Sequence, residues 1–347
     1  MEKNNNILNF SLSAGIFALS ITLLIIGRDI LIPIAIAIVV WYLINALSKI
    51  FNKINSLGIK LPNWVSIIIS MACIIIFLIA IGNLISRNIS EVIEIAPTYQ
   101  ENFNNLLQKI FSALGIEKIP SLGQIVDQID FKSLLSKFAS GAAGIAANAG
   151  IIIIYVLFLL AEQATFPKKL NALFPDTNKL NDVRNLLNKI QNQIQTYIWI
   201  KTLMSLLTGT ICYIILIIVG LDLALFWAFV IFLLNYIPTI GSLLGIVLPS
   251  LLALVQFSSP LPFVAVIITL SITQFCIGSL MEPKLMGRTL NLSPLVVIIT
   301  LVVWSSLWGI AGAILCVPIT VIAMIVFSHF EKTKSIAIIL SGNGKIN

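Results

Sequence analysis

The chain has 347 residues, of which 59% are hydrophobic and only 10% charged, and its mean hydropathy is +1.04. A soluble globular protein carries about 25% charged residues, so this composition excludes that class and indicates an integral membrane protein. The net charge of +7 requires no nucleic-acid partner, because lysine and arginine gather in particular loops, as membrane topology demands.

Long apolar runs fill the chain, and none shows the two-residue alternation of an outer-membrane strand. They therefore predict a helical bundle and exclude a membrane β-barrel. The runs at residues 10–27 and 30–47 predict a retained first helix within a helical hairpin, because the charged region before them is thin and no small-residue cleavage site follows. Further spans are expected at residues 63–86, 141–161, 202–220 and 261–281.

Two apolar stretches in the last third of the chain, residues 221–256 and 293–328, are interrupted in matching places. The first breaks at 235–241 and the second at 308–312, where proline or glycine interrupts the run. As a straight helix, each stretch would extend about 54 Å, against a hydrocarbon core of about 30 Å. Each is therefore predicted to form a helical hairpin, with a re-entrant form as an alternative. Paired interrupted segments of this kind typically mark a transporter's substrate site.

Loop charges predict the orientation of the chain in the membrane. Clusters of lysine and arginine place three loops and both termini in the cytoplasm, and the segment 87–140, with nearly balanced charge, outside. The two hairpins then enter from opposite sides, so that 202–256 and 261–328 form an inverted repeat, as in alternating-access transporters. The expected domains are 1–86 (membrane helices one to three), 87–140 (external amphipathic helical segment), 141–201 (membrane helix four and a cytoplasmic amphipathic helix), 202–328 (transport domain with both broken hairpins) and 329–347 (cytoplasmic tail).

Two segments outside the spans carry helical periodicity. Apolar side chains recur every three or four residues across 176–197, which predicts an amphipathic helix with a start signal at Pro175-Asp176-Thr177. This helix is expected to lie against the membrane or the bundle, with a partner coiled coil as the alternative. The pattern at 99–114 predicts a cap, a vestibule wall or an oligomer contact.

The sequence contains no catalytic or nucleotide-binding motif. Its single histidine, His329, has no neighbouring ligand, and all the cysteines lie in predicted spans without a paired spacing. We therefore expect no cofactor, no metal and no enzymatic activity. The remaining function is transport that is gradient-driven or passive, because the chain shows no ATPase of its own.

Polar residues at membrane depth are few, which makes them candidates for a solute site. Asn235 and Thr239 lie at the first break, and Gln274 lies in the following span. A helix broken near Gly241 offers backbone N–H and C=O groups to a small polar solute, and its new N-terminus favours an electron-rich group. Alternatively, these side chains only satisfy the freed backbone and fix a kink.

Glu282 is the candidate for proton or cation coupling, because an acidic residue near the membrane often marks an ion path. The alternative is an interfacial ion pair with Lys284 or Arg288. A salt bridge from Glu282 to Arg288 is also a candidate gate. Alternatively, Arg288 lies in a turn-rich cytoplasmic linker, where its positive charge only sets the orientation of the chain in the membrane.

Three blocks of the sequence resemble the autoinducer-2 exporter family, also described as PerM-like permeases. They are residues 235–241 with Gly245 and Pro249, residues 282–288, and residues 293–297 continuing to 308–318. The resemblance extends from the first helix to about His329, and its N-terminal half rests on the helix pattern alone.

This resemblance implies eight membrane helices or hairpins, a homo-oligomer with a pentamer as the expected form, and a moving domain built from the broken helices. Members of the family are linked to export of a small furanone-type signal, and others to sodium/proton antiport. The chain departs from the usual Gly-Gln at Ile200-Lys201 and from the usual histidine at Ser293. The second departure removes a titratable group.

These observations predict an all-α, polytopic helical membrane protein with about eight membrane helices. We expect a bacterial inner-membrane permease that moves a small polar solute by alternating access, with export of an autoinducer-2-like signal suggested by the resemblance. Its expected partners are the lipid bilayer, the solute and further copies of the chain. The expected substrate-binding or hinge residues are Asn235, Pro238, Thr239, Gly241, Gln274, Gly309 and Gly312, and those for ion coupling or gating are Glu282 and Arg288.

Two alternatives stay open at this point. A monovalent cation/proton antiporter would use Glu282 and would be recognised by a Glu282 buried away from basic partners. A non-transporting membrane scaffold would have dry, close-packed hairpin tips and would lose no activity when polar residues there become apolar.

Overall fold

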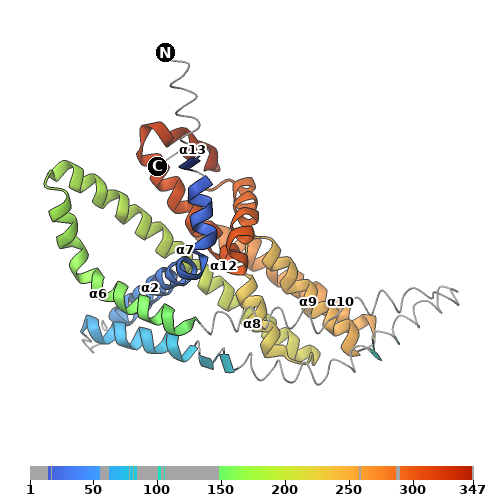
Figure 1. Cartoon of the computed structure of the whole chain (residues 1–347). Coiled ribbons are helices and arrows are strands. Elements are labelled where there is room, and N and C mark those ends of the chain that lie inside the picture. Colours follow the sequence, from blue (N-terminus) through green and yellow to red (C-terminus); the bar gives the residue numbers. More distant parts are fainter. Residues whose placement is uncertain are drawn as a thin grey trace, which may run out of the picture. The chain divides into compact units, whose positions relative to one another are not determined.

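The computed structural model (Figure 1) describes residues 15–16, 18–54, 62–77, 79–80, 82–83, 101–102, 105, 148–257, 259–286 and 290–345. Within these residues the regular structure is helical, and the only bridge outside the helices pairs Leu292 with Ser341. The expected external segment and the start of the span expected at 141–161 lie almost entirely outside the described residues.

Helices long and apolar enough to cross a membrane confirm a polytopic helical membrane protein. In the described part of the chain there are six of them, at Arg28–Asn52, Ala149–Leu173, Thr177–Val219, Ile240–Phe257, Pro260–Met286 and Pro294–His329. Their surfaces suit lipid: only 11% of the most apolar window of Ala149–Leu173 is buried, so its large apolar side chains need a non-aqueous solvent. The count of about eight membrane helices and the inverted repeat stay predictions.

The chain divides into two compact units, which are described separately. The first comprises Met1–Leu43, Asn148–Ile194 and Asn291–Asn347. The second comprises Ile44–Ala147 and Gln195–Leu290. The two predicted broken stretches therefore belong to different units.

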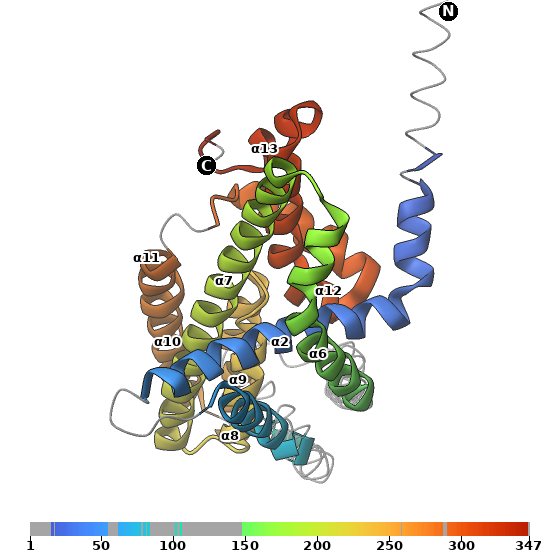
Figure 2. The ribbon, with the colours of Figure 1, turned by 90° about the vertical axis from the view of Figure 1, so that its left-hand side faces the viewer.

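In the first unit, the N-terminal helices form a bend where a hairpin was predicted. Gly27 N–H donates to Leu23 O at 2.8 Å, and Leu31 N–H donates to Gly27 O at 2.9 Å. Helical hydrogen bonding thus continues through Gly27 into α2 (Arg28–Ile54), and the chain changes direction without reversing (Figure 2). The Arg28-Asp29 pair, which suggested a turn, lies in the first turn of α2.

Helices α6 (Ala149–Leu173) and α7 (Thr177–Val219) are joined by a short turn. The predicted start signal is present, because Asp176 Oδ1 accepts a hydrogen bond from Asn178 N–H at 2.9 Å. Arg184 Nη2 donates to Asn171 Oδ1 at 2.6 Å and ties the two helices together. The structure joins the predicted amphipathic helix and the following span into one helix, α7, about 65 Å long.

Helix α12 (Pro294–His329) is two helical segments joined at Gly309, which has φ 60° and ψ −137°. A Cβ added at Gly312 would lie 1.9 Å from Trp304 O. In a straight helix these two residues would be about 12 Å apart along the axis, so the chain folds back at Gly309. The predicted break is therefore present in this stretch.

The C-terminal residues are tied to the start of α12. The short helix α13 (Lys334–Leu340) follows α12 after a single 3-10 turn, and Ser293 N–H donates to Leu340 O at 3.0 Å. Gly342 N–H donates to Asn291 O at 2.9 Å. These backbone bonds fix the end of the chain against the segment that precedes α12.

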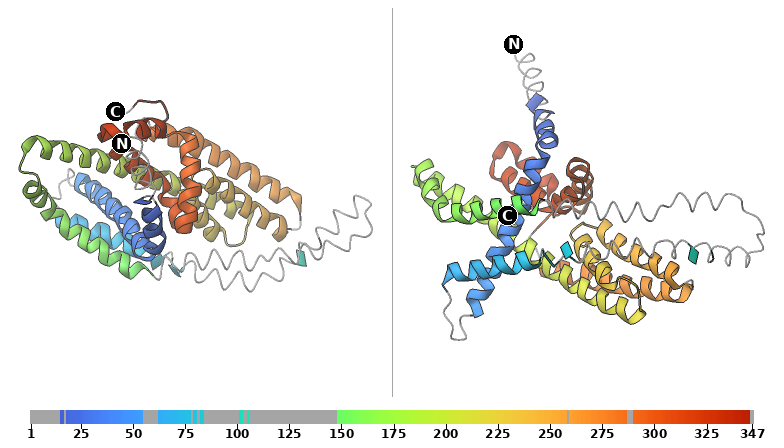
Figure 3. Two further views of the ribbon diagram at one scale, coloured as in Figure 1. Left: turned by 45° about the horizontal axis from the view of Figure 1, so that its top comes forward. Right: turned by 60° about the horizontal axis from the view of Figure 1, so that its bottom comes forward.

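The second unit is built from the rest of α7 and the helices that follow it. These are α8 (Ala224–Leu234), α9 (Ile240–Phe257), α10 (Pro260–Gln274), the π-helix η2 (Phe275–Met281) and α11 (Glu282–Met286). Helices α8, α9 and α10 lie side by side (Figure 3). Their core is apolar and includes Leu216, Trp227, Ile231, Ala253, Val266 and Leu270.

Candidate functional site

The first predicted break is a close-packed turn between α8 and α9. Ile237 N–H donates to Leu234 O at 2.8 Å, and Thr239 has a positive φ of 56°. A Cβ at Gly241 would lie 1.7 Å from Leu234 O, so only glycine allows the start of α9 to come so close to the end of α8. These residues set the geometry of the tip.

A cluster of buried polar side chains lies where this turn meets α7 and α10. We call Ser205, Asn235 and Gln274 the polar cluster; their exposed fractions are 0%, 5% and 7%. Asn235 Nδ2 donates to Ser205 Oγ at 3.2 Å, and Gln274 Nε2 donates to Asn235 Oδ1 at 3.4 Å. The turn thus projects one amide side chain between two helices.

One acceptor of this cluster has no hydrogen-bond partner among the described residues. It is Gln274 Oε1, which is shielded from solvent. A buried polar atom without a partner costs about 1–3 kcal/mol, so such atoms are rare in native structures and call for a specific explanation. A solute that brings an O–H or N–H group would satisfy it.

A buried ion pair lies beside the polar cluster. Lys201 Nζ of α7 is 2.6 Å from Glu282 Oε1 of α11, and the two side chains are only 10% and 13% exposed. The sequence suggested Lys284 or Arg288 as the partner of Glu282. Lys284 is exposed, and Arg288 lies outside the described residues.

The π-helix η2 explains how Gln274 reaches the polar cluster while Glu282 reaches Lys201 of α7. Glu282 follows Gln274 by eight positions, which in a regular α-helix would rotate it about 80° away from the Gln274 face. The extra residue in a π turn shifts the register by about 100° in the opposite sense and leaves an offset of only about 20°. Lys201 and Ser205, one turn apart on α7, then contact Glu282 and Asn235 respectively.

The predicted site residues do not all gather in one place. Asn235 and Gln274 lie in the polar cluster, and Glu282 lies in the ion pair. Pro238, Thr239 and Gly241 form the turn at the tip. Gly309 and Gly312 shape the break in α12, in the other unit.

The start of α9 does not offer the free backbone donors that the sequence suggested. Ile240 N–H donates to Pro238 O, Gly241 N–H to Ile237 O and Leu243 N–H to Thr239 O, so the turn itself uses these groups. The Thr239 side chain is exposed and takes no part in the polar cluster. Side chains, and not the helix terminus, carry the hydrogen-bonding capacity here.

Sequence reasoning missed the contribution of α7. Lys201, Ser205 and Thr208 are all buried, and their spacing of four and three residues places them on one helix face. Thr202 is also involved, because Tyr236 Oη donates to its Oγ1 at 2.8 Å. The signal that could have revealed this face is a polar period of three to four residues inside an apolar run.

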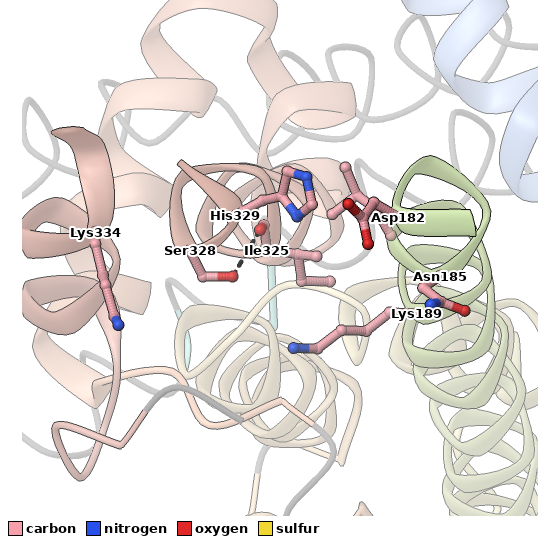
Figure 4. A pocket seen from close by; sticks show the side chains of 8 residues that line it. Asp182, Asn185, Lys189, Ile325, Ser328, His329 and Lys334 are labelled. Atoms are coloured by element: carbon pink, nitrogen blue, oxygen red, sulfur yellow. Dashed lines mark hydrogen bonds between the residues drawn. The ribbon is translucent and has the colours of Figure 1, made fainter. Parts of the chain in front are cut away.

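A hollow lies in the first unit, between α7, the end of α12 and α13 (Figure 4). It encloses about 370 Å³ and is lined by Asp182, Asn185, Leu186, Lys189, Ile325, Ser328, His329 and Lys334. Ser328 Oγ donates to Ile325 O at 2.7 Å. Four of its lining residues, Asp182, Asn185, His329 and Lys334, are exposed, unlike the buried amides of the polar cluster, so we do not assign the solute site to it.

Among the described residues, no group of three or more His, Cys, Asp or Glu side chains could hold a metal ion. Cys212 and Cys316 are buried, whereas Cys73 and Cys276 are exposed.

Comparison with known proteins gives a match over nearly the whole chain. Residues 15–332 match the family described as AI-2E family transporter. The provisionally named transport protein YhhT of Escherichia coli (strain K12) is 27% identical over 318 residues, covering 90% of this chain and 88% of YhhT. The AI-2 transport protein TqsA of the same strain is 24% identical over 323 residues, covering 92% and 91%. A provisionally named transport protein of Borreliella burgdorferi is 29% identical over 252 residues, covering 71% and 68%.

Proposed function

Because this chain belongs to the AI-2E family of transporters, we propose that it is a permease that moves a small, polar, hydrogen-bonding solute through the second unit. The relative named an AI-2 transport protein makes an autoinducer-2-like furanone the first solute to test, in the direction of export. We place the permease in the bacterial inner membrane with both termini in the cytoplasm, and we expect a homo-oligomer. Alternating access is the proposed mode of movement, with the solute site at the first broken hairpin.

The observation that carries the proposal is the unpartnered acceptor Gln274 Oε1 within a buried chain of amide and hydroxyl groups. Gln193 Oε1 and Trp227 Nε1 are also buried without a partner among the described residues, but Gln274 Oε1 alone lies in a chain of buried polar side chains, where an orphaned group lowers stability. A hydroxyl-rich solute supplies the missing donor, and Asn235 and Ser205 hold the Gln274 amide in place. The site therefore suits a neutral polar solute better than an apolar one.

Flux in liposomes tests this proposal. Gln274→Leu and Asn235→Leu should each reduce uptake or release of the furanone about tenfold below saturation, the equivalent of about 1.4 kcal/mol of lost interaction. Thr269→Val is the matched control, because Thr269 lies on the same helix and its hydroxyl donates to Ala265 O of that helix at 2.7 Å. Wild-type flux that survives both leucine substitutions unchanged would place the solute path elsewhere.

The two alternatives fare differently. The antiporter hypothesis requires a Glu282 without a basic partner, and Lys201 Nζ lies 2.6 Å from its carboxylate, so we do not propose it. The scaffold hypothesis requires close-packed tips, and the tip at Gly241 has that property. It also requires that the leucine substitutions be silent, so the same flux measurement separates it from a permease.

A further inference from the structure

The Lys201–Glu282 ion pair is buried, where removing charges from water costs free energy. Its presence therefore calls for a functional explanation. Both side chains are almost buried, and a buried ion pair typically stabilises a fold no better than apolar residues of similar volume. Charged groups at membrane depth instead tend to mark ion or solute paths. This pair borders the polar cluster on the same face of α7.

The ion pair and the polar cluster together contain the kinds of oxygen that bind a monovalent inorganic cation. Glu282 supplies a carboxylate beside Lys201, and the neutral oxygens of the polar cluster begin one turn further along α7, at Ser205. Carboxylate and carbonyl oxygens are the ligands that hard cations prefer. The ε-ammonium of Lys201 is itself a compact, singly charged cation.

We propose that the ammonium of Lys201 takes the place of a monovalent inorganic cation at Glu282. The resident ammonium neutralises the carboxylate, so the protein needs no sodium or potassium ion to complete its site. Lys201 is therefore the residue that sets the cation dependence of this chain. Removing the ammonium leaves a buried carboxylate without a counter-charge, and a sodium ion then binds in its place.

Equilibrium binding of radioactive sodium to the purified full-length protein tests this proposal without any transported solute. In a choline buffer free of other monovalent metal ions, the wild type should show no saturable sodium binding. Lys201→Met should gain a saturable site, with about one sodium ion per chain. The double variant Lys201→Met/Glu282→Gln should lose that site again.

Two results would overturn the proposal: sodium binding by the wild type that disappears in Glu282→Gln, or no binding by a folded Lys201→Met. Size-exclusion elution and thermal unfolding report whether a variant is folded. Lys201→Gln also removes the ammonium and should disturb the packing less, because it keeps a hydrogen-bond donor beside the carboxylate. The sodium measurement is independent of furanone flux, so failure of one proposal does not count against the other.

Discussion

Substitution of Gly241 by alanine is the sharpest test of the hairpin geometry. The added Cβ would lie 1.7 Å from Leu234 O and 3.2 Å from Ile237 Cβ. Since the first of these contacts is with backbone, no side-chain rotation relieves it. The start of α9 must move away from the end of α8, and Asn235 lies within the turn that would be pulled open.

The expected magnitude follows from two opposing terms. Alanine favours a helix over glycine by about 1 kcal/mol, whereas forcing extra volume into a packed site costs about 1–3 kcal/mol and sometimes more. At 1.7 Å the upper end of that range applies, so we expect a net loss of about 2 kcal/mol. Gly245→Ala is the matched control on the same helix, because its Cβ would make an ordinary contact of 3.5 Å with Ile231 Cγ1 and should gain about 0.5–1 kcal/mol.

Unfolding of the two purified variants in the same detergent, followed by temperature or denaturant, measures this difference. Gly241→Ala should unfold at a clearly lower midpoint than the wild type, and Gly245→Ala at the same midpoint or a higher one. The solute flux of Gly241→Ala should fall as well, because its turn positions Asn235. Equal stability of the two variants would refute the close approach of α8 and α9 that the structure describes.

Three further changes have defined outcomes. Neutralising Lys201 or Glu282 alone should lower the free energy of unfolding by about 3–5 kcal/mol, whereas neutralising both should lower it much less. A double-mutant cycle of unfolding free energies measures the coupling between the two residues. Additive losses would contradict the buried pair. Thr239→Gly should raise the unfolding free energy by about 1 kcal/mol, because a β-branched residue at φ 56° is strained, and an unchanged value would argue against strain. Trp308→Phe should cost about 1 kcal/mol by removing the 3.0 Å bond from Trp308 Nε1 to Leu24 O, and a lower thermal midpoint would reveal it.

Much of the fold could be predicted from the sequence because membrane constraints are local. The length of each apolar run sets how it spans the bilayer, and proline or glycine within such a run signals a break. Both breaks, at 235–241 and at Gly309, are present on that basis. Two helix boundaries were predicted where the helix in fact continues. One was the polar-to-apolar change near residue 200, within α7, and the other the charged pair after Gly27, at the start of α2. Both look like ends of helices, but neither contains a residue that must end one.

The candidate site was harder to predict because its partners are distant in sequence. Asn235, Gln274 and Glu282 stood out as polar residues in apolar surroundings. Lys201 did not, since it sits at the point where an amphipathic pattern gives way to an apolar one. The pairing of Lys201 with Glu282 also depends on η2, and a π turn has no reliable sequence signature.

The two breaks use a similar backbone device but differ in their side-chain chemistry. Each has a residue with positive φ, followed within three positions by a glycine packed against a carbonyl of the preceding helix. At the second break, the hydroxyls of Ser305 and Ser306 both donate to Val302 O of their own helix. At the first break, Asn235 reaches across to Ser205 of α7. Trp308 Nε1 at the second break also leaves its own helix and donates to Leu24 O at 3.0 Å. Only the first break, however, joins a buried amide to a second amide and a hydroxyl, which is why we propose the first hairpin as the place of the solute site.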